Sequence, residues 1–190
     1  MELKEINSLV ELFFKKFESK SSEARKELFL VSLRNRNFTG TLSGPYTYSW
    51  ENIETKILIL SNYLKKIITK GDRCILLSEN RPEWLVSDLA IMNAGGVTVP
   101  LFTTYSENDY KFILNDCQPK VCIISNSDQF KKIKNFIKEN TIVISIDEFD
   151  QKIEFFENIF LKLQTDFKTH AKDLITYNNN LIRNDLACII

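Results

Sequence analysis

Short apolar runs alternate with longer amphipathic stretches between residues 71 and 146, and this alternation leaves few folds open. One run and the stretch that follows it take roughly two dozen residues. Continuous apolar runs of this kind are typical of strands that are buried on both faces. They are Cys74–Leu77, Val97–Leu101, Val121–Ile124 and Thr141–Ile146. We therefore predict an α/β fold, with a mostly parallel sheet and helices on both of its faces.

The stretches between these runs carry helix signals. Pro82 suits a first helical turn, and Gly95-Gly96 is expected to end that helix. Ser106 and Asp109 fit a capping box for the next helix. The apolar stripes of the first two helices are Trp84, Leu85, Leu89 and Met92, and then Tyr110, Ile113 and Leu114; a third helix is predicted to start at Ser127 or Asp128 and to carry Phe130, Ile133, Phe136 and Ile137.

Residues 1–45 are predicted to form an N-terminal helix and strand region, and residues 46–190 the α/β subdomain. Apolar residues three and four apart predict an amphipathic helix over residues 3–18, with Leu3, Ile6, Val10, Phe13, Phe14 and Phe17 on one face. This face suits packing in a core or between two copies of the chain. Binding to a membrane surface is the alternative, which glutamates on the polar face weaken.

Two strands and a long helix are predicted next. The strands are Leu28–Leu33 and Tyr46–Tyr48. Ser49 is expected to cap the helix, whose apolar stripe is Ile53, Ile57, Leu60, Leu64 and Ile67.

The last forty residues give a weaker pattern. Phe155, Phe156, Ile159, Phe160 and Leu163 indicate a further helix, and residues 177–180 a loop. Leu186–Ile190 reads as a fifth apolar strand at which the chain ends. Because domains seldom end within a strand, we expect the α/β subdomain to be truncated there.

Composition excludes several classes of protein. Lys plus Arg and Asp plus Glu both number 25, so the balanced charge argues against a nucleic-acid partner. No apolar run reaches the roughly 18 residues of a membrane span. The N-terminus carries acidic residues and resembles neither a secretory signal nor a transit peptide. The expected location is cytoplasmic, with peripheral membrane association through the first helix as the alternative.

Cysteine and glycine usage limits the kinds of site. Cys74, Cys122 and Cys188 lie in apolar runs as small buried hydrophobes, and Cys117 is predicted to lie in a turn. These spacings argue against zinc. Only five glycines occur and they do not form the cluster that a phosphate-binding loop needs.

No catalytic motif is complete. His170 is the only histidine, and it lies in a polar stretch that suits an exposed structural role. Asp147 and Glu148 are predicted to cap a helix N-terminus. Arg81 follows the strand Cys74–Leu77, where ligands bind in open α/β sheets, so Arg81, Trp84 and Tyr105 are the candidate pocket-wall residues. The alternatives are a surface pairing of Arg81 with Glu83 or Asp88, and packing of the two aromatic side chains.

Several pieces of the sequence are informative in their order and spacing. They are TYSWENI at Thr47–Ile53, KGDR at Lys70–Arg73, SENRPEW at Ser78–Trp84, DLAIMNAGGVTVPLF at Asp88–Phe102, YKFILNDCQPKV at Tyr110–Val121 and RNDLACII at Arg183–Ile190. Together they resemble the N-terminal part of the adenylate-forming (AMP-binding) enzymes, most closely the long-chain fatty acyl-CoA synthetases. The last piece is similar to the strand that leads into the phosphate-binding loop of the family.

The resemblance implies a fatty acid–CoA ligase that forms an acyl-adenylate from ATP with Mg²⁺ and then transfers the acyl group to coenzyme A. Its partner would be a fatty acid substrate. The family's reactive loops and metal ligands lie beyond the matching positions, so no catalytic, cofactor-binding or metal residue is carried onto this chain. The chain alone is expected to be inactive and to bind none of these cofactors tightly. The alternatives are a non-catalytic interaction or homodimerisation module, and another adenylating enzyme that acts on an aryl or amino acid.

Overall fold

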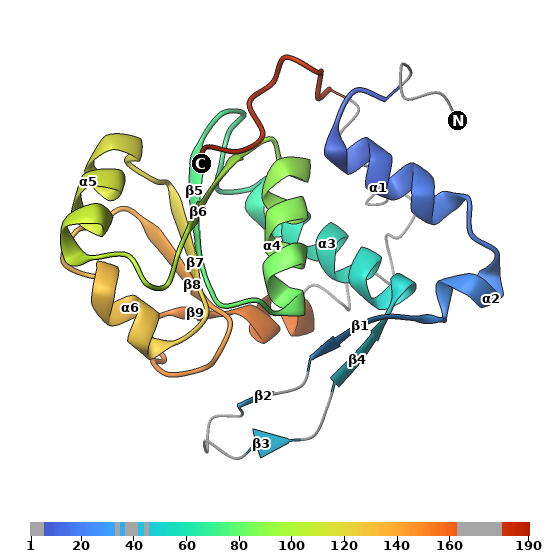
Figure 1. The fold of residues 1–190 in the computed structure, drawn as a ribbon, viewed down its shortest axis with the longest axis horizontal. Helices are drawn as coiled ribbons and strands as arrows, with labels where there is room; N and C mark the ends of the chain where they lie inside the picture. The colour runs from blue at the N-terminus through green and yellow to red at the C-terminus, as the bar shows by residue number, and fades with distance from the viewer. Residues whose placement is uncertain (1–5, 33–34, 37–41, 44–45, 163–179) are drawn as a thin grey trace.

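A five-stranded parallel sheet is the centre of the structure, a computed structural model that describes residues 6–32, 35–36, 42–43, 46–162 and 180–190 (Figure 1). The strands run in the order β6-β5-β7-β8-β9, and every neighbouring pair is parallel. They are β5 (Arg73–Leu77), β6 (Val97–Leu101), β7 (Val121–Ile124), β8 (Ile142–Ser145) and β9 (Glu154–Phe155). The predicted α/β fold with a mostly parallel sheet is confirmed.

Helices cover both faces of this sheet. The helices α1 (Leu9–Glu18), α3 (Trp50–Leu64) and α4 (Pro82–Asn93) lie on one face, and α5 (Glu107–Cys117) and α6 (Ser127–Ile133) lie on the other (Figure 1). A helical segment at 156–162 packs on the first face through Phe156, Ile159 and Phe160. Each face therefore has its own hydrophobic core.

Alternate side chains of each strand enter different cores. In β5, Cys74 and Leu76 belong to the core with α3 and α4, whereas Ile75 and Leu77 belong to the core with α5. All four are fully buried. Because both faces are covered, the strand needs apolar residues at every position, and this is why the strands are continuous apolar runs in the sequence.

An antiparallel hairpin precedes the sheet. Its strands β1 (Leu28–Ser32) and β4 (Tyr46–Ser49) agree with the two predicted strands. The shorter elements near it are α2 (Ser22–Arg25), β2 (Asn35–Arg36) and β3 (Leu42–Ser43). The first helix begins after its N-cap Ser8, later than predicted, and the predicted Leu3 lies outside the described residues.

Capping residues fix where the helices begin. Ser106 and Asp109 form the predicted capping box at α5, and Ser49 caps α3 as predicted, in a capping box with Asn52 that was not predicted. The helix α3 ends at Leu64, so the predicted stripe residue Ile67 lies in the turn beyond it.

The glycine pair after α4 allows a tight return into β6. Gly95 has a φ of +89°, a left-handed conformation that side chains disfavour. At Gly96, an added Cβ would lie 2.9 Å from Cδ1 of Ile68 and 3.0 Å from Cγ2 of Ile91. Gly95 is therefore needed for the turn, and Gly96 for the close approach of the chain to its neighbours.

The helix α6 begins at Ser127, one of the two predicted starts, and its N-cap is Asn126, whose side-chain oxygen accepts from the backbone N–H groups of Asp128 and Gln129. Two other predictions about the second face of the sheet are wrong. The helix ends at Ile133, before the predicted stripe is complete. Cys117 is the last residue of α5 and not part of a turn, because Gln118 ends the helix in the left-handed conformation, with a φ of +45°.

The C-terminal segment differs most from its prediction. Only Cys188 of the expected strand pairs with the sheet, in a parallel bridge to Thr98 of β6. The amide of Thr98 donates to the carbonyl of Ala187, so Thr98 faces the open edge of β6. Two residues on, Pro100 faces the same way and has no N–H to donate. The pairing therefore stops after one bridge.

The four cysteines are free thiols. Cys74, Cys117 and Cys122 are buried, whereas Cys188 is partly exposed. No helix among the described residues is long and apolar enough to cross a membrane. The prediction for His170 lies outside the described residues.

Candidate functional site

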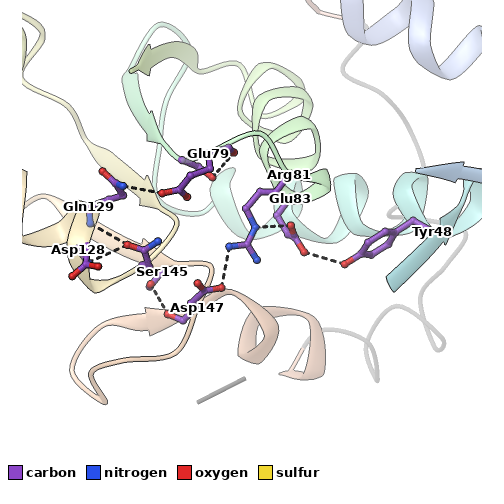
Figure 2. Close-up of polar contacts among 10 residues, drawn as sticks. Tyr48, Glu79, Arg81, Glu83, Asp128, Gln129, Ser145 and Asp147 are labelled. Carbon is purple, nitrogen blue, oxygen red and sulfur yellow. Dashed lines mark hydrogen bonds and ion pairs between the residues drawn. The ribbon is translucent and has the colours of Figure 1, made fainter. Parts of the chain in front are cut away.

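The carboxyl ends of the strands bring polar residues together at one edge of the sheet. From β5 the chain crosses to β6 on one side and then returns to β7 on the other, so the direction of winding changes between β5 and β7. In open α/β sheets, ligands bind outside the carboxyl ends of the strands at such a switch point. Ser78–Arg81, Ser125–Asn126 and Asp147 follow the three strands that meet there. Figure 2 shows Glu79, Arg81 and Asp147 at this edge.

Arg81 is the centre of a network that joins β4, α4 and the end of β8 (Figure 2). Its Nε lies 2.8 Å from Oε2 of Glu83, and its Nη1 lies 2.9 Å from Oδ1 of Asp147. The hydroxyl of Tyr48, on β4, donates to Oε1 of Glu83 over 2.9 Å. The network thus ties the N-terminal hairpin and the start of α4 to the end of β8.

Burial makes the charges of this network interdependent. Burial works to raise the pKa of Glu83, but the attraction of Arg81 and hydrogen bonds, including that from Tyr48, outweigh it and lower the pKa. For Asp147 the balance is reversed, because burial, together with the negative charges of Glu83 and Glu79, raises its pKa by more than Arg81 lowers it. Burial works to lower the pKa of Arg81, and the two carboxylates raise it. Glu83 is therefore the more firmly ionised partner of the guanidinium.

A second polar cluster lies at the switch point itself. The side-chain amide of Gln129, on α6, donates to Oε1 of Glu79 over 2.8 Å (Figure 2). Burial works to raise the pKa of Glu79, but hydrogen bonds, including those from Ser125, Gln129 and Asn126, outweigh it and lower the pKa. Glu79 is itself exposed, so this edge presents an ionised carboxylate to solvent.

The loop after β6 completes the edge. The hydroxyl of Tyr110 donates to the carbonyl of Phe102 over 2.7 Å, and Nζ of Lys132 donates to the carbonyl of Thr103. The ring of Tyr105 lies edge-on to Phe102, with 5.3 Å between the ring centroids. Two helices on the same face of the sheet, α5 and α6, therefore fix the course of this loop.

The three predicted pocket-wall residues lie in different surroundings. Arg81 is part of the ionic network, Trp84 packs against the core on the α3 and α4 face, and Tyr105 packs against the core on the α5 and α6 face. Of the two carboxylates predicted as partners of Arg81, the structure places Glu83 beside it. The role of these three residues in a ligand pocket stays a prediction.

Sequence reasoning missed Tyr48, Asp147 and the pairing of Glu79 with Gln129. Asp147 was expected to cap a helix, but no helix begins within the described residues directly after it, and its carboxylate pairs with Arg81. Their partners lie 35 to 66 residues away in the chain. The sequence offered one signal for the two acids: Glu79 and Asp147 each follow a predicted parallel strand.

The carboxylates at this edge of the sheet are hydrogen-bond acceptors. Arg81 is balanced by Glu83 and Asp147, and Glu79 adds a further negative charge. A phosphate would therefore be repelled here. Within the described part of the chain, no group of three or more His, Cys, Asp or Glu residues is placed so that it could hold a metal ion.

Comparison with known proteins identifies the family. The family model described as "AMP-binding enzyme" matches residues 29–190. The chain belongs to the AMP-binding enzyme family. The predicted resemblance to adenylate-forming enzymes is thereby confirmed.

Relatives within the AMP-binding family include fatty acyl-CoA synthetase A of Dictyostelium discoideum, which is 28% identical over 129 residues, or 64% of this chain and 19% of that protein. Bacitracin synthase 3 of Bacillus licheniformis is 31% identical over 116 residues, or 60% of this chain and 2% of that protein. The crystal structure of ATP-bound MatB from Rhodopseudomonas palustris has the same fold, with a TM-score of 0.62 and 19% identity over 94% of this chain and 31% of that one. The chain thus spans under a third of these relatives.

Proposed function

We propose that this AMP-binding family chain is the N-terminal scaffold of an ATP-dependent long-chain fatty acid–CoA ligase. The observation that carries the proposal is the family match over residues 29–190, together with a relative named fatty acyl-CoA synthetase. The overall reaction would join a fatty acid to coenzyme A through an acyl-adenylate, with ATP and Mg²⁺. The role of residues 46–190 would be to hold the sheet on which the reactive loops are mounted.

The isolated chain is proposed to be inactive. Charge develops on phosphate oxygens during adenylation, and an enzyme must stabilise it with cations or N–H donors. At the carboxyl edge of the described sheet, the cation Arg81 is already paired with Glu83 and Asp147, and the exposed Glu79 adds a negative charge. We therefore expect no ATP–pyrophosphate exchange from the purified 190-residue chain with palmitate, ATP and Mg²⁺. Exchange above the rate of a heat-denatured sample would contradict this.

The fatty acyl assignment can be tested by exchange of segments. Residues 29–190 would replace the matching segment of Dictyostelium fatty acyl-CoA synthetase A and, separately, that of an adenylating module of bacitracin synthase 3. If the chain is a fatty acyl-CoA ligase scaffold, the first chimaera will retain more of its host's acid-dependent ATP–pyrophosphate exchange than the second. Each host without the segment is the control.

The second candidate is an adenylating enzyme that acts on an amino acid. The observation in its favour is the 31% identity to bacitracin synthase 3, which exceeds the 28% identity to the fatty acyl-CoA synthetase. The reverse order of activity in the two chimaeras would support this candidate and overturn the fatty acyl assignment.

A further inference from the structure

A cavity of about 490 Å³ lies at the amino ends of β5 and β6, at the opposite end of β5 from Arg81. Its walls are the first half of α1, the turns that lead into β5 and β6, and residues 181–187. Figure 1 shows the C-terminal segment, in red, passing from the start of α1 to the sheet. Cavities that bind small molecules in proteins have volumes of roughly 300–1,000 Å³, so this cavity has the size of a ligand site.

The lining of this cavity is mainly apolar. At its mouth, Leu9, Ile182 and Leu186 are 58%, 55% and 59% exposed. Exposed apolar side chains around an apolar cavity favour a ligand that removes them from water. The buried side chains of the lining include Ile6, Val10, Met92, Val97 and Leu181.

The polar groups in the walls are already paired. The amide of Gly71 donates to the carbonyl of Gly95, and the amide of Gly96 donates to that of Ile91, each over 2.9 Å. None of the described side chains that line the cavity holds a buried polar atom without a hydrogen-bond partner. Water inside the cavity would therefore find few of the two to four polar partners that an ordered water molecule needs. Displacement of poorly ordered water by an apolar molecule favours binding.

The charged side chains at the mouth are engaged as well. Nζ of Lys70 lies 2.7 Å from Oδ2 of Asp185. Nε of Arg183 donates to the carbonyl of Ile6 over 2.8 Å, and Arg183 has a further interaction partner. An anionic ligand would have to displace Asp185 from Lys70, and burial of a charge without a partner costs free energy. The cavity thus favours a ligand that carries no charge.

We propose that this cavity binds an uncharged apolar small molecule. Such a ligand would remove the apolar lining from water and leave the pairs of the polar and charged groups intact. Its binding would be independent of the proposed ligase function, because the cavity lies at the end of the strands opposite the candidate site.

Two dyes that share one ring framework test the class of ligand. N-phenylnaphthylamine is uncharged, and anilinonaphthalene sulfonate is the same framework with an added sulfonate group. The fluorescence of both dyes rises in apolar surroundings. The purified chain is expected to bind the uncharged dye saturably, with a Kd at least about fivefold lower than that of the sulfonate. Equal or tighter binding of the sulfonate would overturn the proposal.

Met92 reports where the dye binds. The chain contains two methionines, and Met92 lines the cavity, so its signal in a ¹³C-methyl-methionine spectrum can be assigned with Met92→Leu. The uncharged dye is expected to shift the Met92 methyl signal with the same Kd that its fluorescence gives. A rise in fluorescence without a shift of this signal would show that the dye binds elsewhere, and the proposal would be wrong.

Variants on two walls of the cavity separate this site from non-specific binding. Leu186→Asp and Leu9→Asp are each expected to raise the Kd of the uncharged dye about fivefold to tenfold. Leu161→Asp, at a residue that is 66% exposed on the helical segment 156–162, should leave the Kd unchanged. Leu9 is the first residue of α1, where an aspartate favours the helix, so this variant serves as the test if Leu186→Asp does not fold. Equal effects of all three aspartates would contradict a specific site.

Asp185→Asn tests the role of charge at the mouth. It frees Lys70 to pair with an anion, so the Kd of the sulfonate dye should fall about fivefold while that of the uncharged dye stays the same. An unchanged Kd for the sulfonate would show that the pairing of Lys70 does not exclude anions, and the selection of an uncharged ligand would be refuted.

Light scattering at the protein concentrations of the titrations examines the other possible occupant, a second copy of the chain. We expect the uncharged dye to bind with the same Kd at each concentration. Formation of a dimer that abolishes dye binding would show that the second copy covers the cavity, and would overturn the binding of a small molecule there.

Discussion

Glu83 is 5% exposed, and its negative charge depends on Arg81 and Tyr48. Removal of one partner from a buried ion pair leaves the other charge without compensation, which typically costs about 3–5 kcal/mol. An ion pair between exposed side chains, by contrast, typically contributes about 0–1 kcal/mol. The chain contains both kinds, so the two can be compared within one protein.

Arg81→Met is expected to lower the free energy of unfolding by about 3 kcal/mol, because the buried Glu83 and the partly buried Asp147 would lose their cation. Urea denaturation measures this loss. The matched control is Lys131→Met, which breaks an ion pair with Asp128 whose side chains are 65% and 75% exposed, and should cost less than about 1 kcal/mol. Similar losses in the two variants would show that the Arg81 network adds no more than a surface pair.

Glu54, on α3, is the group whose titration should be visible near neutral pH. Its pKa is raised to about 7, chiefly by burial. The attraction of Arg25 lowers the pKa, but by less than burial raises it. Since the folded chain holds this proton more tightly than the unfolded chain, stability should fall as the pH rises from about 4.5 to 7.

Glu54→Gln should remove this dependence. We expect it to raise the free energy of unfolding at pH 8 by about 1–3 kcal/mol, and to change it little at about pH 3, where the carboxyl is protonated in both states. Denaturation curves at the two pH values measure the difference, with Glu51→Gln, at an exposed position on the same helix, as the control. An equal gain at both pH values would contradict the assignment.

At the scale of elements, the cap of α6 shows what local sequence leaves open. Asn126, Ser127 and Asp128 are all good N-cap residues, so their order alone does not select one. The structure selects Asn126, because β7 and the turn after it leave this residue in an extended conformation with its side chain over the first turn.

Asn126→Ala is therefore expected to cost about 1 kcal/mol of stability. Ser127→Ala is the matched control, and it should change stability by less than about 0.5 kcal/mol because Ser127 lies inside the first turn. Chemical denaturation measures the loss of stability in each of the two variants. A larger loss for Ser127→Ala would contradict the observed cap.

The strands and most helices could be predicted because their causes are local. Ile75 and Leu77 are apolar since each strand residue enters a core, and the capping box of Ser106 and Asp109 lies within four residues. The strand order could not be predicted, because it depends on contacts between distant parts of the chain. The same is true of the site: Arg81 and Asp147 are 66 residues apart, and nothing near either residue specifies the other.

At the scale of the whole molecule, the C-terminal segment contacts both the sheet and the N-terminal region. Thr98 of β6 exchanges hydrogen bonds with Ala187 and Ile189, and Arg183 reaches the carbonyl of Ile6, 177 residues away. The segment therefore covers part of the open edge of β6. Uncovered edges are sites at which strands of other molecules can pair.

Deletion of residues 186–190 is expected to lower the free energy of unfolding by about 1–3 kcal/mol, since it removes both backbone hydrogen bonds of Thr98. It should also promote self-association through the exposed edge. Light scattering and denaturation measure the two effects. Deletion of Ile190 alone, a fully exposed residue, is the control and should change neither.

The rates at which the thiols are modified can report local opening of the two hydrophobic cores. Burial raises the pKa of Cys74 to about 12 and that of Cys117 to about 11, so neither reacts readily while the cores are closed. Cys188 is partly exposed, and a thiol reagent should modify it first. Mass spectrometry of the slower modifications, at increasing denaturant, would report separately on the two cores, because Cys74 faces one and Cys117 the other.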